Sequence, residues 1–201
     1  MMNGTKTRQA FTLIEVLVVI TIIGILTSIL VLNFQGVKEK QEIALLADKS
    51  LALMQQAKAD VRSGKVMLND AGDATYLCEG ALFTLGEQPQ FVTTPYLSSE
   101  ECDFESLLFE DYGLNSGSAS VGSIEVDGQE PESILALFVP PAGALMLYSE
   151  DGALTYSGDA ELRFESATYS VDQTQTATVL QLSQNTDFAQ LLLVDPDTDE
   201  E

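Results

Sequence analysis

Residues 11–32 read FTLIEVLVVITIIGILTSILVL, a run of 22 residues that carries a single charge, at Glu15. At about 1.5 Å per residue, an α-helix of this length spans about 33 Å, which is enough to cross the hydrocarbon core of a bilayer. The many β-branched residues would suit a strand in water, but so long a run without turn residues favours a membrane helix. Residues 11–33 are therefore predicted to form a transmembrane helix.

The polar segment before this run, residues 1–10 (MMNGTKTRQA), has only Lys6 and Arg8 as charged residues. The positive-inside rule then predicts a cytoplasmic N-terminus and an extracytoplasmic remainder. The apolar run is too long for an ordinary signal peptide, and Asn33 to Gly36 after it lack the small-residue pattern of a cleavage site. A plain signal anchor is the simpler alternative.

Glu15 argues against a plain anchor. A carboxylate within an apolar membrane segment is costly and by default marks a function. Lys6 and Arg8 could reach back towards it, although they lie nine and seven residues upstream. An amino group created at Phe11 by proteolysis would be a better partner, especially on a neighbouring chain.

The basic leader, Ala10 and the following FTLIEVLVVITIIGIL resemble the leader and N-terminal helix of type IV pilins and type II secretion pseudopilins. The resemblance covers about residues 6–32. It implies that a prepilin peptidase cleaves between Ala10 and Phe11 and that the new amino group of Phe11 is methylated. It also implies that Glu15 pairs with the N-terminus of an adjacent subunit during filament assembly.

Two features depart from that family pattern. The family usually has Gly before the cleavage site, whereas this chain has Ala10, the next smallest residue. Many members also carry a Pro in the apolar run, and this run has none. The nearest substitute is the segment Asn33–Gly36, whose Asn and Gly are weak helix formers.

Residues 34–63 are predicted to extend the helix as an amphipathic segment. Apolar residues recur there at intervals of three or four, which places them on one helical face: Ile43, Ala47, Leu51, Met54, Ala57 and Val61. Ser63-Gly64 should end the helix, with Gly64 as the cap. We expect one helix from about Phe11 to Arg62; the alternative is two helices separated by a loop at Asn33–Gly36.

The charges divide the chain into two parts. Residues 1–65 hold eight basic and five acidic residues, a net charge of +3, whereas residues 66–201 hold Arg163 against 26 acids, a net charge of −25. So acidic a surface repels phosphate backbones and disfavours nucleic acid as a partner. The chain has no His, which excludes Ser-His-Asp and Cys-His catalysis and imidazole metal sites.

Residues 64–194 are predicted to form an acidic extracytoplasmic globular domain that is β-rich from residue 134. Before that point the pattern is weak: Glu100–Tyr112 suggests a short helical turn, and the Gly/Ser-rich Gly113–Ser123 suggests a flexible loop. Asp151-Gly152 indicates a hairpin and Asn185–Asp187 a turn. Strands are expected at Ile134–Val139, Ala144–Ser149, Ala153–Tyr156, Glu161–Phe164, Ala167–Val171, Ala177–Leu182 and Phe188–Val194.

These elements predict an α+β class with a pilin-like plan. The apolar stripe of the helix extension and one face of an antiparallel sheet can bury each other. A long N-terminal helix would then lie packed on a C-terminal antiparallel β-sheet.

Cys78 and Cys102 share one segment on the outer side of the predicted topology. An oxidising compartment permits a disulfide between them, and closing a loop of this size is worth about 3–4 kcal/mol in the chain-entropy model. Two buried free thiols are the alternative.

The tail, residues 195–201, is strongly acidic. Asp195, Asp197 and Asp199 alternate with other residues as Ca²⁺ ligands often do, but the EF-hand spacing is incomplete. A disordered acidic tail is favoured, and no cofactor is expected.

The sequence therefore predicts a pilin-like structural subunit of the inner membrane and not an enzyme. Its expected filament is a type II secretion pseudopilus or a type IV pilus. Its expected partners are other pilin or pseudopilin subunits, prepilin peptidase, the inner-membrane assembly platform and the lipid bilayer. The alternatives are a signal-anchored acidic enzyme or binding protein and a pilus-tip adhesin.

Overall fold

The computed structural model describes residues 13–68, 72–97, 102–110, 117–150, 152–166, 177–186 and 188–194, with residues 29–36, 177, 188, 193 and 194 described by their backbone alone. The chain divides into two compact units, Met1–Lys38 and Glu39–Glu201. The described residues form one long α-helix, a short 3-10 helix and eleven strands that pair in antiparallel fashion. The predicted α+β class is confirmed.

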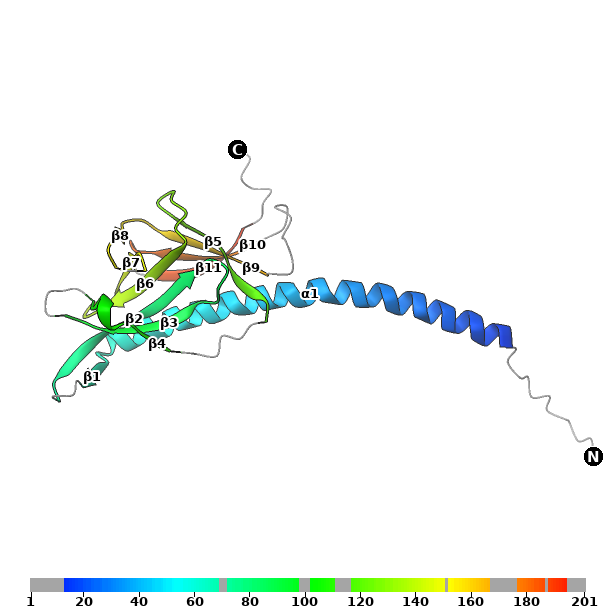
Figure 1. Ribbon diagram of the computed structural model, residues 1–201, viewed down its shortest axis with the longest axis horizontal. Coiled ribbons are helices and arrows are strands. Elements are labelled where there is room, and N and C mark those ends of the chain that lie inside the picture. The colour runs from blue at the N-terminus through cyan, green and yellow to red at the C-terminus, as the bar shows by residue number, and fades with distance from the viewer. Residues whose placement is uncertain are drawn as a thin grey trace, which may run out of the picture. The chain divides into compact units, whose positions relative to one another are not determined.

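Helix α1 runs from Leu13 to Arg62 without interruption (Figure 1). The prediction of a continuous helix is therefore confirmed over the described residues, and the alternative of a loop at Asn33–Gly36 is wrong. Gly64 follows with φ of 76°, a left-handed conformation that glycine adopts without strain, and its N–H donates to the Val61 carbonyl at 3.1 Å. The predicted end of the helix at Ser63-Gly64 is confirmed.

The first sheet has seven strands. Six of them follow the order β4-β3-β2-β6-β7-β8, and β1 pairs with the first residues of β2. Their bounds are β1 Val66–Leu68, β2 Ala74–Thr84, β3 Gln90–Pro95, β4 Leu108–Glu110, β6 Ser133–Val139, β7 Ala144–Tyr148 and β8 Thr155–Tyr156.

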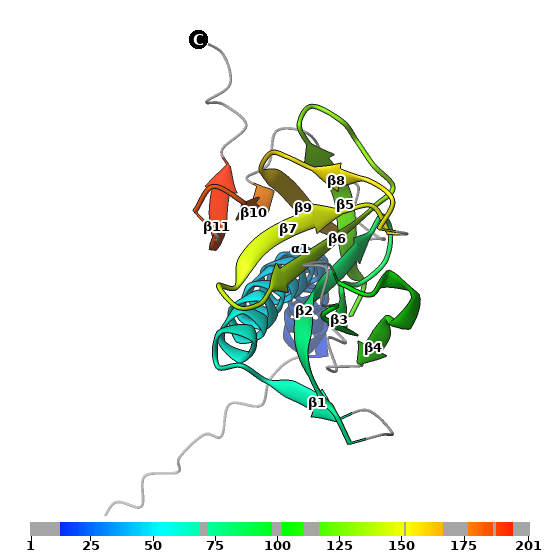
Figure 2. The same cartoon turned by 90° about the vertical axis from the view of Figure 1, so that its left-hand side faces the viewer.

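The second sheet has four strands in the order β11-β10-β9-β5. Their bounds are β5 Ala119–Val126, β9 Ala160–Ser166, β10 Ala177–Ser183 and β11 Phe188–Val194. The two sheets meet where Leu85, just after β2, bridges Val121 of β5. Figure 2 shows the strands of both sheets gathered around the C-terminal part of α1.

Most of the strands predicted after residue 134 are confirmed. Strands β6, β7, β8, β9, β10 and β11 each overlap a predicted segment. β7 and β8 form the hairpin predicted around Gly152, whereas the strand predicted at Ala167–Val171 lies outside the described residues.

The segment before residue 134 differs from the prediction. Five strands precede that residue, and the loop predicted at Gly113–Ser123 is wrong from Ala119 onward, because β5 begins there. The small residues of β5 concealed its pattern: Ala119, Val121 and Ile124 are buried, and Gly122 sits at a bulge where a Cβ would lie 2.5 Å from the Glu165 side chain. The predicted helical turn is a single 3-10 turn, η1 (Phe104–Ser106), and β4 begins after the intervening Leu107.

One hydrophobic core joins the C-terminal part of α1 to both sheets. Met54, Ala57 and Val61 of the predicted helical stripe are buried in it, and Ile43 and Leu51 pack at its margin. The buried face is wider than predicted, because Leu46 and Leu53 also belong to this core. The other members come from both sheets and include Phe83, Phe91, Phe138, Leu147, Leu162 and Leu180.

A second, smaller core covers the opposite face of the first sheet. Cys78, Leu82 and Val92 of β2 and β3 contribute to it, together with Leu135, Leu137 and Tyr148 of β6 and β7. Residues 102–107 lie over these side chains, with Cys102 buried and Phe104 and Leu107 packed at the margin. This first sheet is therefore covered on both faces, which explains why β2 and β6 are apolar almost throughout.

Candidate functional site

The predicted processing site, Ala10 and Phe11, lies outside the described residues. Glu15 lies in the first turn of α1, where a carboxylate interacts favourably with the positive end of the helix dipole. It is the only charged residue between Leu13 and Val37. The structure thus places the predicted assembly carboxylate at the start of a long apolar stretch of helix.

The surface of this stretch is apolar on every side. All side chains from Leu13 to Ser28 are exposed within the single chain, and large aliphatic residues such as Ile14 and Leu17 recur around the whole circumference. A soluble helix normally keeps a polar face, so a helix that is apolar all round requires an apolar environment or a partner.

The hydroxyl groups in this stretch do not make its surface polar. Thr21 donates to the Leu17 carbonyl at 2.8 Å, Thr27 to the Ile23 carbonyl at 2.6 Å, and Ser28 to the Gly24 carbonyl at 2.8 Å. Each hydroxyl hydrogen is therefore satisfied by the helix itself, four residues back.

Among the described residues, no helix has both the length and the sustained hydropathy that crossing a membrane requires.

Polar contacts hold the C-terminal part of α1 at both ends of its packed segment. Glu42 Oε2 accepts hydrogen bonds from the backbone N–H and the hydroxyl of Ser118, each at 3.2 Å, just before β5. The Ser118 hydroxyl also lies 2.7 Å from that of Ser166, at the end of β9. At the other end, Arg62 Nε donates to the Ala142 carbonyl at 3.1 Å, in the turn between β6 and β7. The helix is thus tied to each sheet by a polar contact as well as by the core.

A buried carboxylate lies near the end of α1. Glu79 of β2 is fully buried, and its Oε1 lies 2.7 Å from Nζ of Lys65, which follows the helix. Burial raises the pKa of Glu79 above its ordinary value, because the ammonium group offsets only part of the lost hydration. The hydrogen bond to Glu79 in turn raises the pKa of Lys65.

Sequence reasoning missed the pairing of Glu79 with Lys65. A signal was present: Glu79 is the only charged residue in the eleven-residue β2, ATYLCEGALFT. A single acid within an apolar strand suggests a buried charge, but the partner could not be identified from spacing, since Lys65 lies fourteen residues away.

Cys78 and Cys102 form a disulfide with an S–S distance of 2.07 Å and a Cα–Cα distance of 6.1 Å. The predicted pairing is confirmed, and the alternative of free thiols is wrong. The bond joins the middle of the first sheet to the segment 102–107. The packing of Phe104 against Tyr148, with ring centroids 4.8 Å apart, reinforces the same attachment.

The described part of the chain contains no cluster of Cys, Asp and Glu side chains arranged to hold a metal ion. The predicted acidic tail, with Asp195, Asp197 and Asp199, lies outside the described residues.

No curated protein and no solved structure matches this chain. One family model does match, and it covers the stretch that includes Ala10, Phe11 and Glu15. Residues 5–31 carry the prokaryotic N-terminal methylation motif, which is the prepilin-type cleavage and methylation signal of type IV pilins and pseudopilins.

Proposed function

We propose that this protein is a structural subunit of a pilin-like filament, either a type II secretion pseudopilus or a type IV pilus. Prepilin peptidase cleaves it between Ala10 and Phe11 and methylates Phe11. Its partners are then other pilin or pseudopilin subunits and the inner-membrane assembly platform. This role is structural and requires neither a catalytic site nor a cofactor.

The observation that carries the proposal is the contrast between the two parts of α1. Every side chain from Leu13 to Ser28 is exposed and most are apolar, whereas Leu46, Met54 and Ala57 are buried in the core of the second unit. A helix that is apolar all round needs lipid or the helices of neighbouring subunits to cover it. Together with the methylation motif, this supports a helix that is held first by the bilayer and then by the filament.

The proposed topology is a single pass through the inner membrane by residues 11–33. Lys6 and Arg8 favour a cytoplasmic N-terminus. The second unit would then lie outside the cytoplasm, in an oxidising compartment that suits the disulfide between Cys78 and Cys102.

The test is to express the full chain in cells with an active prepilin peptidase and to determine the mature N-terminus by mass spectrometry. We expect an N-methylated chain that begins at Phe11, found both in the membrane and in a sheared filament fraction. Ala10→Gly should speed cleavage because it restores the residue usual in the family, whereas a bulky residue such as Ala10→Phe should block it. A chain that still begins at Met1 beside an active peptidase would contradict the proposal.

A further inference from the structure

The hairpin formed by β1 and the first residues of β2 exposes an apolar face. Val66 pairs with Tyr76, and Leu68 pairs with Ala74. Side chains that are directly opposite in such a ladder, and those two residues apart on one strand, point to the same side. All four are exposed, Leu68 at 67%, Tyr76 at 53% and Val66 at 45%. We call these four residues the β1–β2 face.

This face is not the side by which the hairpin packs on the rest of the second unit. Met67 and Thr75, which point to the other side, are half-buried. The hairpin also projects beyond the C-terminal end of α1 (Figure 1). Clusters of large exposed apolar side chains are uncommon on soluble domains and mark interaction sites. The β1–β2 face is therefore a candidate contact surface.

A second surface of low charge lies on α1, on the side that faces away from the core. We call its residues the outer stripe, and they are the exposed positions from Gln41 to Ala59: Gln41, Ala44, Leu45, Asp48, Ala52, Gln55, Gln56 and Ala59. Asp48 is the only charged residue among them, and Leu45 is 47% exposed. A surface helix normally carries many charges on its solvent side, so this stripe suits an apolar partner.

The charges of the chain favour a contact between these two surfaces on different copies. Residues 66–201 carry a net charge of −25, so two such domains repel each other where their acidic surfaces meet, whereas residues 1–65 carry +3. The helix of a neighbouring copy is thus the surface that an acidic domain approaches at the lowest electrostatic cost. The margins also match: Asp73 borders the β1–β2 face, and Lys49 borders the outer stripe.

The size of the β1–β2 face argues for an extended assembly and against a simple dimer. A stable interface buries about 800 Å² on each partner and involves about 20–30 residues. A face of four residues is far smaller, so it contributes one contact among several. Because the two surfaces differ, the contact is head-to-tail and repeats from copy to copy without closing.

We propose that the β1–β2 face of one subunit packs on the outer stripe of α1 in a neighbouring copy of this chain. Leu68 and Tyr76 are then buried against the side of the helix that carries Leu45 and Ala52. This inference rests on the filament role proposed above and adds to it a contact outside the apolar stretch Leu13–Ser28.

Crosslinking of the full chain, in cells with an active prepilin peptidase, tests the pairing of the two surfaces. Leu68→Cys and Ala52→Cys are introduced singly and together, and the sheared filaments are treated with a bis-maleimide. The native cysteines are joined to each other and do not react. We expect a ladder of dimers, trimers and longer products from the double variant alone. A dimer from Leu68→Cys alone, or filaments of the double variant that give no ladder, would overturn the proposal.

Filament yield is the second measurement. Leu68→Asp should lower the sheared filament fraction by about tenfold, because a charge replaces an apolar side chain that the contact buries. Ala52→Asp, on the other surface, should have the same effect. Leu154→Asp is the matched control and should leave the yield unchanged, because Leu154 is 62% exposed but belongs to neither surface. Resistance of the second unit to trypsin shows that each variant is folded.

The wild type separates a wrong contact from a wrong function. If the processed wild type forms filaments and folded Leu68→Asp forms as many, the contact is wrong and the filament role stands. If the processed wild type forms no filaments, the filament role fails and the contact fails with it.

Discussion

Glu79 and Lys65 form an ion pair with unequal environments. The carboxylate is fully buried, whereas the Lys65 side chain is 42% exposed. The pKa of Glu79 is raised by burial, so its charged form carries a cost in the folded state. Since the folded state binds this proton more readily than the unfolded chain does, Glu79 favours folding more as the pH falls through its folded-state pKa. This contribution of Glu79 to the free energy of unfolding is complete below its unfolded-state pKa of about 4.3.

Lys65→Met tests this pair. We expect the free energy of unfolding to fall by about 2 kcal/mol at pH 7, because a buried carboxylate loses its counter-charge; the exposure of Lys65 keeps the loss below that of a fully buried pair. The loss should shrink towards pH 5, as Glu79 takes up a proton. Urea unfolding at both pH values measures the two losses.

Two further variants distinguish the pair from a general loss of charge. Lys49→Met removes a partly exposed Lys from α1 and should cost much less at either pH. Glu79→Gln resembles the protonated acid at every pH. It should therefore abolish the increase in the free energy of unfolding that protonation of Glu79 produces as the pH falls. If the Lys65→Met loss were the same at pH 5 and pH 7, ionised Glu79 would not be its source.

The segment 102–107 covers one face of the first sheet. Cys102 attaches it to β2 by the disulfide, Asp103 N–H donates to the Pro95 carbonyl at 2.8 Å, and Asp103 Oδ1 accepts from the Glu105 N–H at 3.1 Å. The Thr94 hydroxyl donates to the Asp103 carbonyl. These contacts hold Phe104 and Leu107 against the outer face of the first sheet.

Removing the disulfide should loosen this cover. We expect the double change Cys78→Ala and Cys102→Ala to lower the free energy of unfolding by about 3 kcal/mol, because the unfolded chain gains the entropy of a 24-residue loop. Amide hydrogen exchange at residues 103–107 should accelerate more than exchange in α1, which belongs to the other core.

Non-reducing peptide mapping is the independent check of that bond. It should recover the peptides of Cys78 and Cys102 as one linked species. Recovery of both cysteines in alkylated form from the native, unreduced protein would show that the thiols are free, contrary to the structure.

At the scale of the whole molecule, the two units differ in the chemistry of their surfaces: one is largely apolar and the other is acidic. Leu13–Ser28 is apolar with Glu15 as its one charge, whereas residues 66–201 carry a net charge of −25. Neighbouring apolar helices can pack in many axial registers, since one aliphatic ridge resembles the next. An ion pair between Glu15 and the Phe11 amino group of the next subunit would select one register, because both groups lie at defined depths on their helices.

Glu15→Leu should therefore reduce filament yield sharply while leaving membrane insertion, folding and processing nearly intact. The comparison is between the sheared or crosslinked filament fraction and the membrane-bound monomer, for wild type and variant. Glu15→Asp, which keeps the charge on a shorter side chain, is the control and should retain part of the assembly. Equal filament yields for Glu15→Leu and wild type would remove the assembly role and restore the plain signal anchor.

Local sequence patterns were sufficient wherever the signal lay within a few residues. The helix from Leu13 to Arg62 and its end at Gly64 followed from periodicity and capping. The strands after residue 134 followed from apolar runs between turn residues. The methylation motif is local too: it lies within residues 5–31 and can be recognised in the sequence without any knowledge of the fold.

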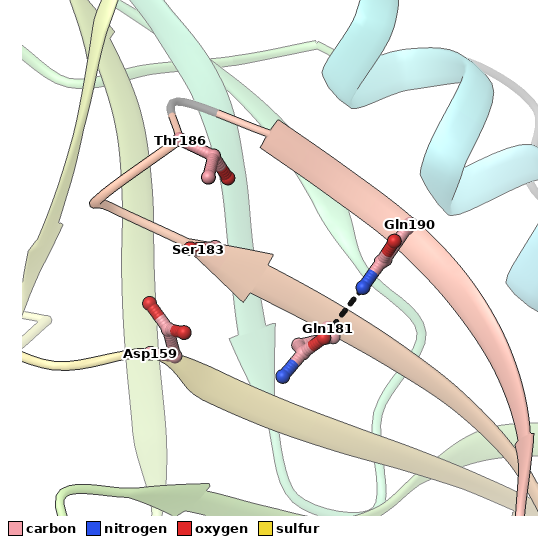
Figure 3. A pocket seen from close by; sticks show the side chains of 5 residues that line it. All are labelled: Asp159, Gln181, Ser183, Thr186 and Gln190. Atoms are coloured by element: carbon pink, nitrogen blue, oxygen red, sulfur yellow. Dashed lines mark hydrogen bonds between the residues drawn. The ribbon is translucent and has the colours of Figure 1, made fainter.

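Only the tertiary structure decided the features that depend on residues far apart in the chain. The Ser- and Gly-containing strand β5 gains its stability from its pairing with β9 and from burial of Val121 and Ile124, which composition alone does not reveal. The Glu79–Lys65 pair joins separate segments in the same way, and so does the small pocket on the second sheet that is lined by Asp159, Gln181, Ser183, Thr186 and Gln190 (Figure 3). The physical reason is the same in each case: burial and pairing are set by which elements pack together, whereas helix, turn and cleavage signals act through neighbouring residues.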